Sequence, residues 1–177
     1  QPDLALVRRL LEETIEYGTL PFSILARHAF IGVSLLRSLV SRGVLQEHEK
    51  NNFMRCVHTV ASDVVSALAA TSKGSAETDS FFRRFGHLRP GTYDIMSWRY
   101  DERPDIYLGK ISSNLETIET PAFEMNSVNE RSIAVCLNEA NFGGITPRAL
   151  LDYVATSIAY REEAKFAFSR GLSDALA

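Results

Sequence analysis

The chain has 177 residues, 45% of them hydrophobic and 23% charged, and a formal net charge of −3. This length and composition predict one soluble globular domain with a sizeable core, and the mildly acidic balance gives no reason to expect nucleic acid or an anionic membrane as a partner. Cys56 and Cys136 are too few and too far apart for a disulfide framework or a zinc site, so we expect a cytoplasmic protein.

Apolar residues at helical spacing predict three helices in the first 72 residues. The first covers residues 3–16 and is expected to end at Tyr17-Gly18-Thr19. The second runs from Pro21 to about Arg42, with Gly43 as its stop, and the third runs from near Gln46 to about Ser72. Short connections between long helices predict antiparallel packing.

The middle of the chain is less regular. A short helix is predicted over residues 77–85, followed by an irregular loop over 86–104 and another short helix from Asp105 to Leu108. Residues 110–125 have no readable periodicity, and we expect them to form an exposed insertion.

Helical signals return in the last third of the chain. Ser127 and Glu130 fit a capping box, and a helix from this point is expected to stop at 141–144, Asn-Phe-Gly-Gly. Thr146-Pro147 restarts the chain as N-cap and first helical residue of a helix that reaches Leu176, unless Gly171 bends or ends it. The most apolar stretch, 29–40, contains Arg37 and is too short to span a bilayer.

These elements predict a mainly α fold, an antiparallel multi-helix bundle of about six helices with an irregular central loop. We expect residues 1–177 to form a single helical domain, with helices over about 3–72 and 126–177. The start at Gln1 rather than Met is expected of a domain from a longer protein, and processing of the chain would give the same start.

The central loop concentrates groups that bind anions or stack on rings. Four potentially cationic side chains, those of Arg83, Arg84, His87 and Arg89, fall within seven positions. Aromatic residues follow them: Tyr93, Trp98, Tyr100 and Tyr107. Gly86 is predicted to take a positive φ and end the preceding helix, and Pro90-Gly91 fits the centre of a type II turn. The pattern predicts a rigid loop that presents an imidazole and a guanidinium.

The best binding candidates lie in this loop. His87 and Arg89 would hold a phosphate or carboxylate, with Arg84, Tyr93 and Asp94 as further candidates. The alternative is architectural. Arg89 would pair with Asp94 or Asp101, and His87 would cap a helix end.

Other polar residues suggest no catalytic site. His28 and His58 lie on apolar helices and are expected in the core or an interface, whereas His48 lies in a charged stretch and is expected in solvent. Adjacent carboxylates such as Glu162 and Glu163 diverge by about 100° on a helix and make no catalytic dyad. No metal-ligand spacing and no Walker-type loop occurs, so we assign no catalytic residue and no metal.

The wording of three separated segments resembles the helical region of phosphoenolpyruvate-utilising phosphotransferases, the phosphoenolpyruvate synthase-like proteins. These segments are 85–95, Phe-Gly-His-Leu-Arg-Pro-Gly-Thr-Tyr-Asp-Ile; 20–27, Leu-Pro-Phe-Ser-Ile-Leu-Ala-Arg; and the stretch from 161, Arg-Glu-Glu-Ala-Lys-Phe, to 172–176, Leu-Ser-Asp-Ala-Leu. In that family such a region lies between an ATP-grasp domain and a swivelling phosphohistidine domain.

The resemblance implies a helical substrate-side or linker domain that is not catalytic by itself. Its partners would be the ATP-grasp and phosphohistidine domains of the same parent chain, which would use ATP and Mg²⁺, whereas this region needs no cofactor. Antibiotic-phosphorylating members more often read Gly-His-Arg-Gly-Pro-Gly-Glu where this chain has 86–92, Gly-His-Leu-Arg-Pro-Gly-Thr, so an antibiotic acceptor is not indicated. The alternative function is a helical protein-interaction module without enzymatic activity.

Overall fold

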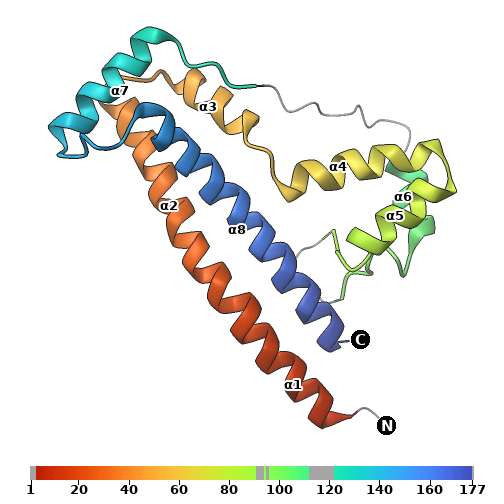
Figure 1. Ribbon diagram of the computed structural model, residues 1–177. Coiled ribbons are helices and arrows are strands. Elements are labelled where there is room, and N and C mark those ends of the chain that lie inside the picture. Colours follow the sequence, from red (N-terminus) through yellow and green to blue (C-terminus); the bar gives the residue numbers. More distant parts are fainter. Residues whose placement is uncertain (1–2, 91–93, 95, 112–121, 177) are drawn as a thin grey trace. The chain divides into compact units, whose positions relative to one another are not determined.

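The computed structural model describes residues 3–90, 94, 96–111 and 122–176, and these residues are largely helical (Figure 1). No β-strand occurs among them, so the prediction of a mainly α fold is confirmed. The α-helices are α1 (Leu4–Thr14), α2 (Leu20–Ser41), α3 (Glu47–Cys56), α4 (Val60–Ala70), α5 (Ser75–Phe85), α6 (Pro104–Ile111), α7 (Ser127–Glu139) and α8 (Pro147–Leu176).

The helices divide into two compact units, each assembled from separate stretches of chain. Unit 1 comprises Gln1–Phe22, Val60–Glu119 and Glu162–Ala177, and unit 2 comprises Ser23–Thr59 and Thr120–Arg161. Neither unit is continuous in sequence. The prediction that residues 1–177 form a single domain stays a prediction.

Unit 2 is held together by α2, α3, α7 and the first part of α8. Gly32 lets α2 approach α8 closely, since a Cβ at this position would lie 3.3 Å from the Cα of Val154. Around this contact lies a continuous apolar core, built from Ala29, Leu36, Leu39, Leu45, Phe53, Val57, Ile133, Leu137, Leu150, Leu151, Val154 and Ile158.

Unit 1 has its own, more aromatic core. Phe81 and Phe85 of α5 are each 1% exposed and pack with Val60 and Leu68 of α4. The last part of α8 pairs with α1: Thr14 lies against Gly171, and Gly18, four residues later, lies against Phe168. Residue numbers increase along α1 while those of the contacted residues in α8 decrease, so the two segments are antiparallel.

The predicted stop at Tyr17-Gly18-Thr19 is wrong. A π-helical turn over Ile15–Thr19 joins α1 to α2, and the helix continues without interruption from Leu4 to Ser41. Gly18 is buried here, and a Cβ would lie 3.3 Å from the Cα of Phe168. The glycine therefore serves close helix packing and does not end the helix.

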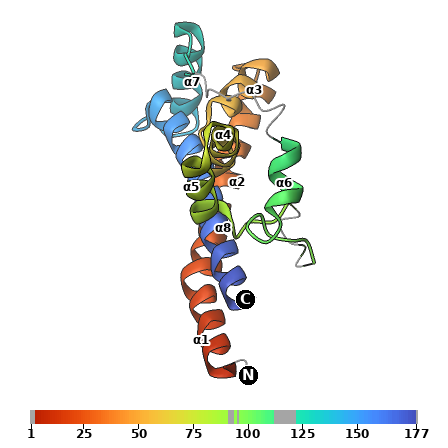
Figure 2. The same ribbon diagram turned by 90° about the vertical axis from the view of Figure 1, so that its right-hand side faces the viewer.

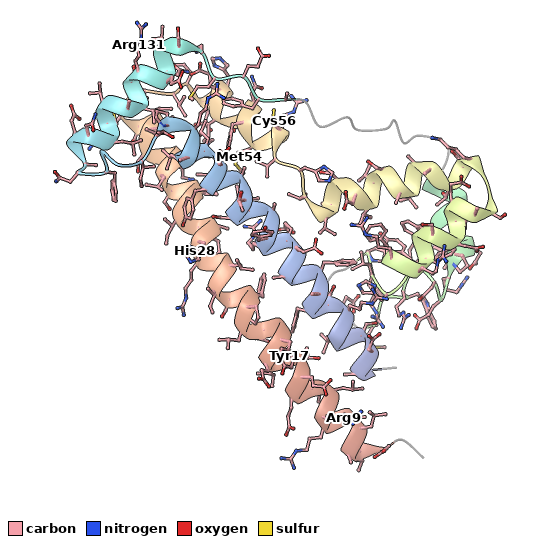
Figure 3. The ribbon with its side chains drawn as sticks, viewed as in Figure 1. Arg9, Tyr17, His28, Met54, Cys56 and Arg131 are labelled. Carbon is pink, nitrogen blue, oxygen red and sulfur yellow. The ribbon has the colours of Figure 1, made fainter. Side chains whose placement is uncertain are left out.

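This continuous helix carries apolar residues on its exposed side as well. Leu4, Ile15, Tyr17, Leu20 and Ile24 are all exposed, and Figure 3 shows Tyr17 projecting from the helix. A window within Leu4–Ser41 has a mean hydropathy of 1.4, which makes the helix long and apolar enough to cross a membrane by length and composition. The sequence prediction missed this property because it divided the helix at Gly18.

The third predicted helix is also divided. Its residues form α3 and α4, with Val57 in an extended conformation at ψ 111° between them. Gly43 is a stop as predicted, with φ of 73°. The helix predicted to run from Gln46 to Ser72 is wrong because Val57 is buried in the core of unit 2 whereas Val60 is buried in that of unit 1.

The cap of α7 lies one residue earlier than predicted. Asn126, not Ser127, is the N-cap, and its side-chain oxygen accepts a hydrogen bond of 2.8 Å from the backbone N–H of Asn129. At the other end Asn141 takes the positive φ of 62°, and Phe142 donates its backbone N–H to the carbonyl of Leu137 at 2.7 Å.

The final helix begins and ends as predicted. Thr146 caps α8 by accepting a hydrogen bond from the backbone N–H of Ala149 at 3.1 Å. Gly171 does not end the helix, which continues to Leu176. Instead, its lack of a side chain leaves room for Thr14. Most of the insertion expected over 110–125 lies outside the described residues.

Candidate functional site

The central loop of unit 1 is anchored where α5 ends (Figure 2 shows α5 and α6, the helices on either side of it). Leu88 accepts a backbone hydrogen bond from Tyr100 at 3.0 Å, and Gly86 accepts one from Asp101 at 3.2 Å. Gly86 has φ of −56°, so the expected positive φ is wrong. Its small size matters instead, because a Cβ would lie 2.9 Å from a carboxylate oxygen of Asp101. The Gly91 of the predicted turn lies outside the described residues.

His87 is buried rather than displayed. The residue is 7% exposed, and the centroid of its ring lies 4.9 Å from the centroid of the Phe166 ring. Nε2 has no hydrogen-bond partner among the described residues. Burial lowers the pKa of the imidazole to about 4, assisted by the charges of Arg170 and Arg99 and opposed by those of Asp174 and Asp101. His87 is therefore neutral at physiological pH.

Arg89 is half-buried and makes hydrogen bonds within unit 1. Its Nε donates to the backbone carbonyl of Ser97 at 2.8 Å, and its Nη1 donates to the hydroxyl of Ser173 on α8 at 3.4 Å. These bonds link the loop to the helix. Neither acceptor is the carboxylate that the architectural alternative predicted.

The two expected carboxylate partners have other roles. Asp94 accepts hydrogen bonds from the Ser97 hydroxyl and the Met96 backbone N–H, which lower the pKa of its carboxyl, and the charge of Arg89 adds a smaller effect. Asp101 is paired with Arg99 through both carboxylate oxygens. The pairing raises the pKa of the Arg99 guanidinium.

Of the remaining two candidates, the structure describes only Arg84, which does not join this group. Arg84 lies over the Phe85 ring at 4.8 Å from its centroid and donates to Asp63 of α4 at 2.6 Å. Tyr93 lies outside the described residues. His87, Arg89 and Asp94 thus share one loop, but the hydrogen bonds of Arg89 to Ser97 and Ser173 and those of Asp94 to Ser97 and Met96 do not join the three side chains to one another.

Aromatic side chains of the loop pack against the core of unit 1. The Tyr100 ring lies 5.7 Å from Phe81 and 5.2 Å from Tyr107, and burial raises the pKa of its hydroxyl. Tyr107 donates its hydroxyl hydrogen to the carbonyl of Trp98 at 3.2 Å. Trp98 remains exposed.

The sequence analysis missed the contribution of α8. Phe166 and Ser173 contact the loop, and the charges of Arg170 and Asp174 act on His87. Positions 166, 170 and 173 recur at helical spacing and so lie on one face. The spacing could have predicted that these residues share one face of the helix, but it does not predict which segment packs against this face.

The other histidines form no such environment. His28 is exposed, and its Nδ1 lies 3.0 Å from the hydroxyl of Tyr153, so it does not lie in the core, and its placement in an interface stays a prediction. His58 is exposed too, so only its predicted placement in an interface stays open, whereas His48 is exposed as predicted. Among the residues described by the structure, no cluster of three or more His, Cys, Asp or Glu side chains is arranged to hold a metal ion.

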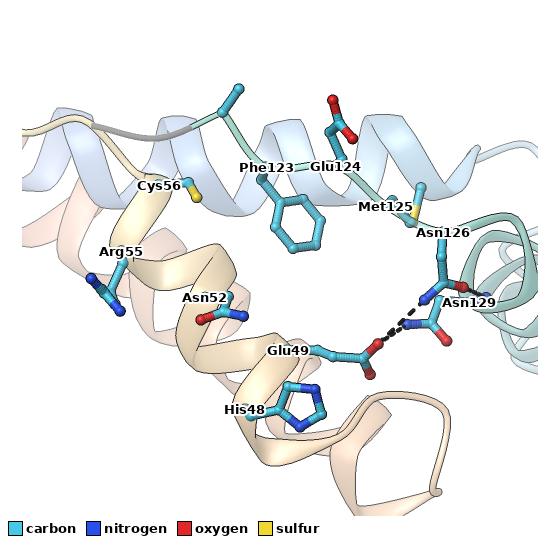
Figure 4. A pocket seen from close by; sticks show the side chains of 11 residues that line it. His48, Glu49, Asn52, Arg55, Cys56, Phe123, Glu124, Met125, Asn126 and Asn129 are labelled. Carbon is cyan, nitrogen blue, oxygen red and sulfur yellow. Dashed lines mark hydrogen bonds between the residues drawn. The ribbon is translucent and has the colours of Figure 1, made fainter. Parts of the chain in front are cut away.

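Unit 2 has a separate open pocket of about 500 Å³ between α3 and the segment leading into α7 (Figure 4). Glu49 lies at one side and accepts hydrogen bonds from the amides of Asn129 at 2.7 Å and Asn126 at 3.3 Å. Its second oxygen accepts from the backbone N–H of Gln46, the chief cause of a lowered carboxyl pKa. Glu49 therefore joins the beginnings of two helices.

The contacts of Arg89 predict a measurable loss of stability in Arg89→Ala. The change removes two hydrogen bonds and leaves the buried Ser173 hydroxyl without this donor, so we expect a cost of about 1–3 kcal/mol in unfolding free energy. Arg83→Ala, at an exposed position of α5, is the matched control and should change stability by less than about 0.5 kcal/mol. Urea unfolding followed by the single Trp98 measures both. Equal stability of the two variants would contradict the architectural role of Arg89.

Comparison with known proteins gives one match. The family described as rifampicin phosphotransferase fourth domain matches residues 34–162, which include the whole central loop. No curated protein and no solved structure matches the chain. The match covers more than half of the sequence and confirms the resemblance to phosphoenolpyruvate-utilising phosphotransferases. The chain belongs to the rifampicin phosphotransferase fourth-domain family.

Proposed function

We propose that this chain is the helical substrate-side or linker domain of a phosphoenolpyruvate synthase-like phosphotransferase and has no catalytic activity alone. The family match over residues 34–162 carries the proposal. The parent protein would move phosphoryl groups between ATP, a phosphohistidine and an acceptor, in the cytoplasm. ATP and Mg²⁺ would be held by the ATP-grasp domain of the same polypeptide.

The burial and hydrogen bonds of the loop residues favour a structural role for the loop over a catalytic one. A base or a phosphocarrier must reach its substrate, whereas His87 is buried under Phe166. Arg89 and Arg99 are bound to groups of unit 1. We propose that the loop holds the end of α8 in the position from which the domain contacts the acceptor and orients the phosphohistidine domain.

The acceptor itself is left open in this proposal. The family description names rifampicin as the substrate of the phosphotransferase concerned. The loop of this chain reads Leu88-Arg89-Pro90 after His87. Because this wording departs from that of antibiotic-phosphorylating members, we propose no antibiotic as acceptor.

A second candidate, a protein-interaction module, is favoured by one observation. The helix from Leu4 to Ser41 exposes large apolar side chains, among them Leu4, Ile15 and Leu20. Helices that are apolar on several sides are normally covered. The sequence encoded beside this chain discriminates the two functions: ATP-grasp and phosphohistidine segments there support the phosphotransferase, and their absence supports the module.

The proposal predicts that the isolated chain is inactive. Incubated with radiolabelled ATP or phosphoenolpyruvate, it should neither hydrolyse ATP nor acquire label, because its sequence has no Walker-type phosphate loop and its four histidines include no candidate phosphocarrier. Label is measured after separation under alkaline conditions, which preserve phosphohistidine. Stoichiometric label would show that the chain is a phosphocarrier and not a supporting domain.

A further inference from the structure

Unit 1 contains an apolar groove between α4 and the last part of α8. It has a volume of about 290 Å³ and is lined by Val60, Ala61, Val64 and Val65 of α4, by Leu88 of the loop, and by Glu162, Lys165, Phe166 and Ser169 of α8. Ligand pockets for small molecules are typically apolar, begin near about 300 Å³ and carry a few fixed polar groups. The groove is close to this size, and its lining is mostly apolar, with Glu162, Lys165 and Ser169 as its polar residues.

One wall of this groove is shared with the buried histidine. Phe166 lines the groove, and the same ring lies 4.9 Å from the His87 imidazole. Leu88, another lining residue, is the neighbour of His87 in the chain. The Nε2 of this imidazole has no hydrogen-bond partner among the described residues.

We propose that the groove and the His87 imidazole together form a binding site for a small, neutral, mostly apolar molecule that carries one hydroxyl group. The apolar body would lie between α4 and α8, and the hydroxyl would form a hydrogen bond with Nε2 after Phe166 moves aside. A buried polar atom without a partner is costly, so a hydroxyl that satisfies it adds affinity. This site requires no phosphoryl transfer and can fail or succeed independently of the proposed function.

The ligand is neutral because its partner is neutral. Burial keeps the imidazole uncharged. The charges of Arg170 and Arg99 lower its pKa, whereas those of Asp174 and Asp101 raise it. Glu162 and Lys165, which line the groove, carry opposite charges, so the groove offers no net charge to an ionic ligand.

The test compares two probes that differ by one hydroxyl, 2-naphthol and naphthalene, in titrations of the whole chain. Wild type should bind 2-naphthol about fivefold more tightly than naphthalene, the factor given by one hydrogen bond of about 1 kcal/mol. In His87→Phe, which keeps a buried ring but has no Nε2, the two probes should bind equally. Imidazole nitrogen resonances of His87 should shift with 2-naphthol only.

A second variant pair tests the groove. Ala61→Leu places a larger side chain in the groove from an exposed position of α4 and should weaken both probes, whereas Ala149→Leu, at an exposed alanine of unit 2, should leave both affinities unchanged. Circular dichroism confirms that each variant is folded. The proposal is overturned if wild type binds neither probe, if it binds both equally, or if Ala61→Leu binds them as well as Ala149→Leu does.

Discussion

Acidification from pH 7 to pH 4 is expected to cost wild type about 3 kcal/mol of unfolding free energy relative to His87→Gln. The pKa of His87 is lowered from an ordinary 6.5 to about 4 in the folded chain, chiefly by burial. As the pH falls below about 6.5, the unfolded chain binds a proton at this histidine while the folded chain does not. Stability is therefore lost across this window, and the loss ends once the pH lies below the folded pKa.

Urea unfolding followed by Trp98 fluorescence measures this effect, because the only tryptophan lies in the loop of unit 1. His87→Gln is the required control, since glutamine does not titrate while the carboxylates of the chain titrate in both proteins. Parallel stability profiles of wild type and variant between pH 7 and pH 4 would show that His87 is accessible to solvent and protons in the folded chain.

Gly86→Ala should destabilise unit 1 by about 3 kcal/mol. A Cβ at this position would lie 2.4 Å from the backbone carbonyl oxygen of Phe82 and 2.9 Å from a carboxylate oxygen of Asp101. Either the last turn of α5 or the Asp101–Arg99 pair must move, and overpacking of this kind costs about 1–3 kcal/mol or more. The loss should come from crowding alone, because the φ of −56° is one that alanine adopts readily.

Gly144→Ala is the matched control. No heavy atom lies within 4 Å of a Cβ built at Gly144, so the change should leave stability within about 0.5 kcal/mol of wild type. Circular dichroism and Trp98 fluorescence report the two unfolding transitions. If Gly86→Ala were as stable as Gly144→Ala, the close approach of Asp101 to the end of α5 would not exist in solution.

The helices were predictable where local signals decide the structure. Gly43 takes a positive φ, and Thr146 with Pro147 begins α8, because turn and capping chemistry depends on a few neighbouring residues. The boundary at Gly18 failed because the glycine is used for contact with Phe168, more than a hundred residues away. A single sequence does not distinguish a glycine that ends a helix from one that packs against another helix.

The candidate site was predictable in position but not in arrangement. Residue types located the loop and its cationic groups, since Gly, Pro, His and Arg there are unusual and adjacent. Their roles depend on α8, whose Ser173 bonds Arg89 and whose Phe166 covers His87. The pairing of Asp101 with Arg99 in place of Arg89 was equally open in the sequence, because both arginines are close along the chain.

The proposed function is tested most directly by locating the phosphohistidine that it predicts in the longer protein that would carry this chain. After incubation with radiolabelled ATP, mass spectrometry under alkaline conditions identifies the labelled histidine. The account predicts label on a histidine outside residues 1–177, and none on His28, His48, His58 or His87. Stoichiometric label on any of these four would contradict the assignment of this chain as a supporting domain.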